Sequence, residues 1–270
     1  MISIPKISTN IRYFSHFEPS NIIFIFQHLH ETYFLIDYLR ISKNFTNFVY
    51  LYITRIKSMK VKIFVCNMLH VNCYLVYDEQ SREAAVIDPG FYWDNEKQLF
   101  AKFIEDNNLT IKHLLCTHLH FDHIFGTSFI AEKYGVTLKA SLADNPWIEN
   151  FESSVARFGI RPNGIPCKVG QPLHDGDILS LGDETLQCIA TPGHSAGGLC
   201  FYAKESNYLF AGDTLFQSSI GRTDFSDGNY AQLIRSIQER LLTLPAETIV
   251  FPGHGDTTTI GDETNYNPYL

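Results

Sequence analysis

One short stretch decides how this chain folds and what it does: THLHFDH, residues 117–123. Three imidazoles and a carboxylate fall within six positions, directly after an apolar run that predicts a strand. Side chains of an extended segment repeat their direction every second residue, so His118 and His120 should face one side. Where the chain turns into a helix, Asp122 and His123 can point to a neighbouring position. These donors suit Zn(II), Fe(II) or Mn(II), and their arrangement suits two adjacent ions better than one.

Three further residues of this kind follow predicted strands. His194 and His254 each come after a Pro-Gly pair, which marks a sharp turn at the end of a strand. Asp213 follows the apolar run 208–211, where an unpaired carboxylate would be costly unless it meets a cation. Four strand ends therefore predict one metal site, with seven candidate ligands: His118, His120, Asp122, His123, His194, Asp213 and His254.

The remaining histidines lack this setting. We interpret them as ordinary polar residues, and only His70, in a turn that could come near the site, is left open. The interpretation covers His16, His28, His30, His113 and His174.

From Met59 onward the sequence alternates predicted strands with a few predicted helices. The strands are predicted at residues 60–66, 71–77, 84–87, 111–116, 136–139, 178–181, 185–190, 199–203, 208–211 and 248–251. The helices are predicted at residues 95–106, 124–134, 144–154 and 230–242, the first with Leu99, Phe100 and Phe103 on its buried face. Two sheets packed together, with helices outside, would bury such runs on both faces.

Charge divides the chain of 270 residues into two parts. The net charge is -8, but residues 1–58 carry six basic and three acidic side chains, so residues 59–270 carry -11. Residues 1–58 contain no glycine, and we interpret them as an atypical N-terminal extension that is poorly packed or not natively translated. Charged residues interrupt their most apolar run, so a spanning helix is not expected. The acidic remainder disfavours nucleic acid and anionic membrane surfaces as partners.

The six cysteines form no C-x-x-C pair, and most lie in apolar, strand-like runs. They are expected to be reduced core residues, which places the protein in the cytoplasm.

The motif H-x-H-x-D-H, followed in order by His194, Asp213 and His254, resembles the metallo-β-lactamase superfamily, and the resemblance runs from about Met59 to Leu270. The string Gly-Arg-Thr-Asp-Phe at 221–225 and the tail 253–268 resemble the short glyoxalase-II-like (hydroxyacylglutathione hydrolase-like) enzymes. The resemblance implies an α+β fold, an αββα sandwich of two mixed sheets with flanking helices. Residues 59–270 would form this hydrolase domain.

The same resemblance implies how the ligands divide. His118, His120 and His194 would hold one ion, and Asp122, His123 and His254 the other, with Asp213 bridging both. Two divalent ions, Zn(II) in the first place and Fe(II) or Mn(II) as alternatives, would activate a shared water. The expected reaction is hydrolysis of a small thioester, such as a hydroxyacylglutathione, by attack of a metal-bridging hydroxide. Asp122 and Asp213 are the expected catalytic residues, and Asp122 would also orient the nucleophile.

Three residues are weaker candidates for contact with a ligand or with the substrate. Asp88 either orients a metal ligand or caps a turn. Arg222 either grips a substrate carboxylate or pairs with Asp224 to hold its loop.

Other functions remain open at this stage. A persulfide dioxygenase with one iron shares the Gly-Arg-Thr-Asp-Phe string, and a lactonase or β-lactamase is a weaker reading. A non-catalytic metal-binding module would hold its ion in a closed site. The chain ends soon after His254, without the helical domain that grips glutathione in longer enzymes, so another small thioester is an alternative substrate. The sequence leaves the oligomeric state open.

Overall fold

Residues 59–270 are the part of the chain that the computed structural model describes. The predicted N-terminal extension, residues 1–58, and its histidines lie outside the described residues. Over residues 59–270, no helix combines the length and the apolar character that crossing a membrane requires.

Six strands build the first sheet, in the order β1-β2-β3-β4-β5-β6. Their bounds are β1 Met59–Cys66, β2 Val71–Asp78, β3 Glu83–Ile87, β4 Thr110–Leu115, β5 Leu138–Ala140 and β6 Gln171–Pro172. The first three strands pair antiparallel, whereas β3, β4, β5 and β6 pair parallel. Both faces of β2 and β3 are covered, which explains their almost continuous apolar sequences.

The second sheet also has six strands, in the order β14-β13-β10-β9-β8-β7. Their bounds are β7 Ile178–Leu181, β8 Glu184–Ala190, β9 Leu199–Ala203, β10 Tyr208–Gly212, β13 Ile249–Pro252 and β14 Thr258–Thr259. Only β10 and β13 pair parallel. A separate hairpin joins β11 Leu215–Phe216 to β12 Ser219–Ile220.

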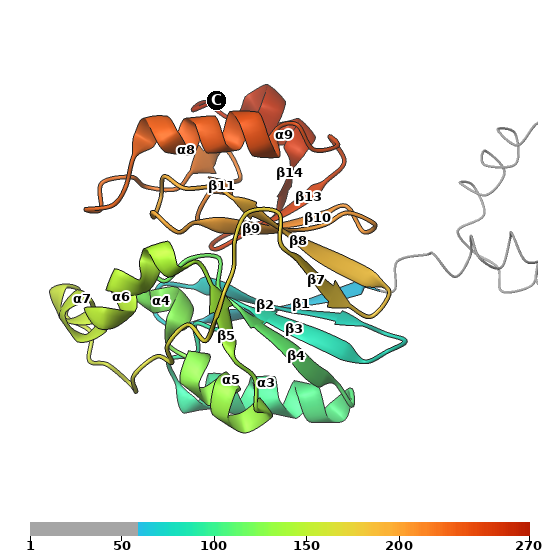
Figure 1. Cartoon of the computed structure of the whole chain (residues 1–270), viewed down its shortest axis with the longest axis vertical. Coiled ribbons are helices and arrows are strands. Elements are labelled where there is room, and N and C mark those ends of the chain that lie inside the picture. Colours follow the sequence, from blue (N-terminus) through green and yellow to red (C-terminus); the bar gives the residue numbers. More distant parts are fainter. Residues whose placement is uncertain (1–58) are drawn as a thin grey trace, which may run out of the picture. The chain divides into compact units, whose positions relative to one another are not determined.

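Helices cover the outer face of each sheet (Figure 1). The first sheet carries α3 Asp94–Asp106 and α5 Thr127–Tyr134, and the second carries α8 Tyr230–Ser236 and α9 Ile260–Tyr266. Short helices gather at one end of the sandwich: α4 Phe121–Ile124, the 3₁₀ turn η2 Leu142–Asp144, α6 Asn145–Glu149 and α7 Phe151–Arg157. The predicted αββα architecture is therefore confirmed.

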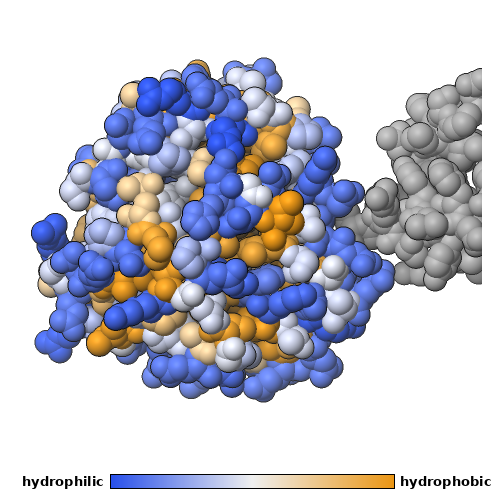
Figure 2. Space-filling model, in the orientation of Figure 1, coloured by the Kyte–Doolittle hydropathy of each residue, from blue (hydrophilic) through white to orange (hydrophobic). Residues whose placement is uncertain are grey.

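Aromatic side chains join the two sheets. The rings of Phe210 and Phe251 stack at a centroid distance of 5.0 Å, and Tyr74 from the first sheet packs edge-on against both. The hydroxyl of Tyr74 donates a hydrogen bond to the carbonyl of Pro252, two residues before His254. This buried layer fixes the end of β13 against the first sheet, while the visible outer surface is mostly hydrophilic with separate apolar patches (Figure 2).

All four helical predictions need correction. Leu99 does not lie on the buried face of α3: its exposed fraction is 62%, and Phe100 and Ile104 make the buried contacts instead. The segment 144–154 is broken into shorter helices at Asn150, and the segment 230–242 changes after Ser236 into a π-helical turn, η3 Ile237–Leu241. The apolar spacing of the sequence does not distinguish these cases. It fits a buried face shifted by one residue in α3, and it fits a change from α-helical to π-helical hydrogen bonds after Ser236.

The predicted helix 124–134 begins earlier and is interrupted. It starts at Phe121 as α4, and α5 begins only after Gly126. The amide of Gly126 donates to the carbonyl of Pro89, and a Cβ at Gly126 would come within 2.7 Å of that oxygen. The interruption is therefore set by a contact with the turn after β3, which the local sequence does not reveal.

The corrected phase of α3 gives a stability prediction. Phe100→Ala should lower the free energy of unfolding by about 3–5 kcal/mol, because it leaves a cavity among buried aromatic rings. Leu99→Ala should change it by no more than about 0.5 kcal/mol. Urea unfolding of both variants measures the difference, and equal losses would contradict the observed phase.

Candidate metal centre

The ends of four strands converge at one edge of the sandwich. The loop after β4 carries His118 and His120, and α4 continues from it with Asp122 and His123. The amide of Leu199 donates to the carbonyl of Thr117, so β9 of the second sheet holds this loop. The loops after β8, β10 and β13 supply His194, Asp213 and His254, and all seven sequence-predicted residues lie together.

Three histidines form the first group. His118, His120 and His194 are all buried, and one ring nitrogen from each lies within 4.8 Å of the others. Their ring centroids are 4.6–4.8 Å apart and nearly perpendicular. Three nitrogen donors around one point fit a single cation.

The second group contains a carboxylate. Asp122, His123 and His254 also place one donor atom each within 4.8 Å of the others. Nε2 of His254 lies 3.5 Å from Oδ2 of Asp122, and the side chain of His254 is 28% exposed. This group is thus the one that solvent reaches.

Asp213 lies between the two groups. Its Oδ1 is 3.4 Å from Nε2 of His123, and its Oδ2 is 3.5 Å from Nε2 of His194 and 3.6 Å from Nε2 of His254. A Cβ at Gly253 would collide with this carboxylate, so the residue before His254 must be a glycine. The two carboxylate oxygens of Asp213 therefore lie close to donor atoms of both groups.

The donor atoms pass a test for a cation. Buried polar atoms are nearly always hydrogen-bonded, and an orphaned one is costly. Yet five of them at this edge have no hydrogen-bond partner among the described residues: Nε2 of His118, His120, His123 and His194, and Oδ1 of Asp213. The residues present therefore fit a pair of divalent ions.

The imidazoles are oriented through their other ring nitrogen. Nδ1 of His194 lies 2.7 Å from the carbonyl oxygen of Arg222, and Nδ1 of His254 lies 3.0 Å from that of Leu69. A carbonyl accepts only from N–H, so Nδ1 carries the proton and the lone pair of Nε2 faces the centre. His70, left open by the sequence, is exposed in the turn beside Leu69.

Burial favours the neutral imidazole at His118 and at His120. Burial, reinforced by the neighbouring imidazoles, lowers the pKa of His118 well below its ordinary value, and burial with His194 lowers the pKa of His120 to about 3. Burial would raise the pKa of Asp213, but the adjacent His123, His254 and His194 together outweigh burial and hold that pKa well below its usual range. Neutral imidazole and ionised carboxylate are the states that bind metal.

Asp88 contacts the site from behind. Its Oδ1 accepts from the amide of Thr117 at 2.7 Å, and its Oδ2 accepts from the hydroxyl of Thr117 at 2.7 Å and lies 3.1 Å from Nδ1 of His123. It therefore supports the His118 loop and orients His123 at once. Asp88 also appears in a third group of close donors with His118 and His123, but its carboxylate is already engaged.

Asp144 is a supporting residue that the sequence analysis missed. Its fully buried carboxylate accepts from the amide of Leu119 at 3.1 Å, from the hydroxyl of Ser195 at 2.8 Å and from the amide of Gly197. It thus ties the loop of His118 and His120 to the loop of His194. In sequence Asp144 resembles any residue that begins a helix, so no local signal distinguishes it.

Arg222 and Asp224 lie beside the first group of histidines. Nε and Nη2 of Arg222 donate to the two carboxylate oxygens of Asp224, each at 2.6 Å, on the exposed surface. The guanidinium of Arg222 also lies 4.5 Å from the ring centre of Phe225, which packs against His120. The ion pair therefore neutralises both side chains and fixes the loop.

Two other histidines have separate roles. Nε2 of His113 lies 2.9 Å from the carbonyl oxygen of Ser180, and Nδ1 of His174 lies 3.6 Å from the carboxylate of Asp177. The structure brings neither into the groups of donor atoms described above.

Comparisons with known proteins agree with this geometry. A family model described as the Metallo-beta-lactamase superfamily matches residues 67–254. Hydroxyacylglutathione hydrolase GloC of Haemophilus influenzae is 36% identical over 216 residues, covering 78% of this chain and 98% of that protein.

Two solved structures share the fold. BLEG-1 B3 metallo-beta-lactamase has a TM-score of 0.72 and 32% identity, covering 78% of this chain and 99% of its own. TTHA1623 in a di-iron-bound form has a TM-score of 0.69 and 34% identity, covering 78% of this chain and 100% of its own.

The contact between Asp88 and His123 gives a prediction about metal affinity. In Asp88→Asn, an amide N–H₂ would face Nδ1 of His123, which favours the tautomer with the proton on Nε2. Affinity for an ion in the second group should fall about 10–100-fold. Competition with a chelator, read as metal per chain, measures this.

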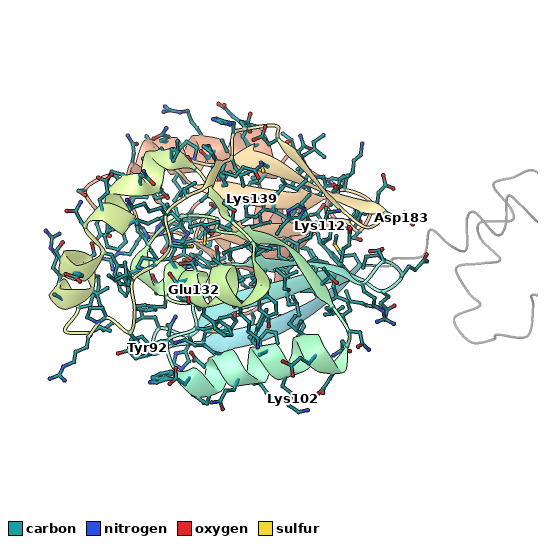
Figure 3. The ribbon with its side chains drawn as sticks, turned by 60° about the horizontal axis from the view of Figure 1, so that its bottom comes forward. Tyr92, Lys102, Lys112, Glu132, Lys139 and Asp183 are labelled. Atoms are coloured by element: carbon teal, nitrogen blue, oxygen red, sulfur yellow. The ribbon has the colours of Figure 1, made fainter. Side chains whose placement is uncertain are left out.

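The matched control is Asp183→Asn, which removes the same charge at the exposed tip of the sheets (Figure 3). It should retain metal like the unmodified protein. Equal retention by both variants would contradict the orienting role of Asp88.

Proposed function

The chain belongs to the metallo-beta-lactamase superfamily, and from that premise we propose that it is a dinuclear metal-dependent hydrolase of a small thioester. One observation carries the proposal: seven side chains from four strand ends meet, with five donor atoms left without a hydrogen-bond partner among the described residues. A site for one ion would need only the first group of histidines. It would not explain why Asp122, His123 and His254 also converge. The second group therefore favours a pair of ions over one.

The ligand roles are part of the proposal. His118, His120 and His194 would hold one ion, Asp122, His123 and His254 the other, and Asp213 both. When bound, two such ions lower the pKa of a shared water and polarise a carbonyl. Zn(II) is our first candidate for the metal. Fe(II) and Mn(II) are the alternatives, and the di-iron form of TTHA1623 supports Fe(II).

The residues of this chain assist each part of the reaction. Water adds its oxygen to the thioester carbonyl carbon, the C–S bond breaks, and the departing sulfur takes up the proton, giving an acid and a thiol. Oδ2 of Asp122, close to the partly exposed His254, would accept a hydrogen bond from the attacking water and so orient it. Asp213 holds the two groups of donors in one relative position.

The choice of a thioester rests on likeness. GloC is named a hydroxyacylglutathione hydrolase, and a hydroxyacylglutathione is accordingly our first candidate substrate. The charge of -11 on residues 59–270 favours a small molecule over nucleic acid. We also propose a cytoplasmic location, because all six cysteines are unpaired and five are buried.

Purified protein should therefore contain two divalent ions per chain and hydrolyse S-lactoylglutathione. Asp213→Asn should lower kcat/KM at least about a hundredfold, since changes one shell further out already cost about 10–100-fold in a metal site. Asp183→Asn is again the matched control and should retain full activity. Elemental analysis and release of free thiol are the measurements.

The main alternative is a persulfide dioxygenase. Measuring oxygen uptake with glutathione persulfide distinguishes it from the proposed hydrolase. One iron per chain with oxygen consumption would replace the hydrolase by a persulfide dioxygenase. Bound metal without turnover of either substrate would favour a non-catalytic metal-binding module.

A further inference from the structure

A pocket of about 390 Å³ opens beside His254. Its other walls come from the β11–β12 hairpin and from the turn after β13, and they include Phe216, Gln217, Ser219 and Asp256. Of the residues lining it, only His254 belongs to the proposed ligands. The pocket therefore adjoins the metal centre and can hold a part of the substrate that does not itself react.

The hairpin wall is held in place from behind. The amide of Ser218 donates to a carboxylate oxygen of the buried Glu263 at 2.9 Å, and the side-chain amide of Asn267 donates to the carbonyl of Ser219 at 3.0 Å. Both partners come from the C-terminal segment around α9. The pocket is therefore preformed, which limits the ordering cost of binding.

Charge is distributed unequally around the centre. Beside the first group of histidines, Arg222 neutralises Asp224. At the pocket, the carboxylate of Asp256 is exposed and has no hydrogen bond or ion pair among the described residues, and no lysine or arginine is among those that line the pocket. Behind the hairpin, Glu263 adds a second carboxylate. Apart from the ions that the centre would hold, the uncompensated side-chain charge on this side is thus negative.

The side chains that line the pocket are of the kinds that bind a positively charged group, such as an ammonium. The ring of Phe216 lies 6.4 Å from that of His254, and an aromatic face attracts a cation. Gln217 and Ser219 offer oxygen acceptors, and Asp256 offers a full negative charge.

We propose that this pocket receives the thiol end of the substrate and selects a cationic head there, with Asp256 as the specificity-determining residue; this rests on the proposed function. In a thiol that carries charges of both signs, the ammonium end is the one that fits the pocket. A carboxylate at the same place meets Asp256 and is disfavoured.

Three thioesters with one lactoyl group test the proposal. Their thiols are thiocholine, N-acetylcysteamine and 3-mercaptopropionate, which carry a cationic, a neutral and an anionic head. The measurement is kcat/KM at fixed ionic strength, from the release of free thiol. Because the intrinsic reactivity of each ester is the same for every variant, a change in the thiocholine to mercaptopropionate ratio reports the protein alone.

The ratio should fall about fivefold in Asp256→Asn, in the upper range for one exposed charge, and further in Asp256→Lys. The neutral ester should change less than twofold. Asp183→Asn and Asp183→Lys make the same charge changes at the distant tip of the sheets and should leave the ratio unchanged. Equal ratios in Asp256→Asn and Asp183→Asn would overturn the assignment while the proposed hydrolase stands.

Binding of choline alone gives a readout that does not need turnover. Saturation-transfer NMR should show weaker binding of choline to Asp256→Asn than to Asp183→Asn. If the unmodified protein cleaves neither S-lactoylglutathione nor any of the three esters, the proposed function fails, and this titration decides the pocket separately. Equal binding of choline to both variants would overturn it.

Discussion

The arrangement of this site depends on one electrostatic constraint: several buried nitrogen and oxygen atoms have no hydrogen-bond partner within residues 59–270. Four imidazole Nε2 atoms and Oδ1 of Asp213 are removed from water without a compensating hydrogen bond. Each such atom costs free energy, and the two carboxylates nearby, Asp122 and Asp213, add charge in a place of low dielectric. Cations remove both penalties at once, so the same atoms that destabilise an empty centre make it selective for charge.

That constraint explains why so much of the surrounding polypeptide is used for orientation. The carbonyl groups of Arg222 and Leu69 determine which nitrogen of His194 and His254 faces inward. Asp88 does the same for His123 and also supports the loop of His118. These contacts come from loops far apart in sequence, so the fold must be complete before the ligand atoms converge.

The sequence predicts part of this arrangement and misses another part for physical reasons. The αββα fold and the residues that gather at one edge are predictable, because a strand end is a local pattern and the H-x-H-x-D-H spacing is compact. The phase of α3 is not, since Leu99 and Phe100 fit the same apolar pattern and only packing separates them. Asp144 is missed because its three donors come from two distant loops.

The residues that would carry out the reaction and those that would select the substrate lie on different parts of the fold. The proposed ligands stand on strand ends held by both sheets, and a change there would disturb every neighbour. The pocket beside His254 is built from a two-stranded hairpin, which Glu263 of α9 braces, and from the turn that follows His254. Loops tolerate substitution better than the scaffold that carries them. A chain of this architecture can therefore change the head group that it accepts, through Asp256 and its neighbours, without rebuilding the centre that would carry out the reaction.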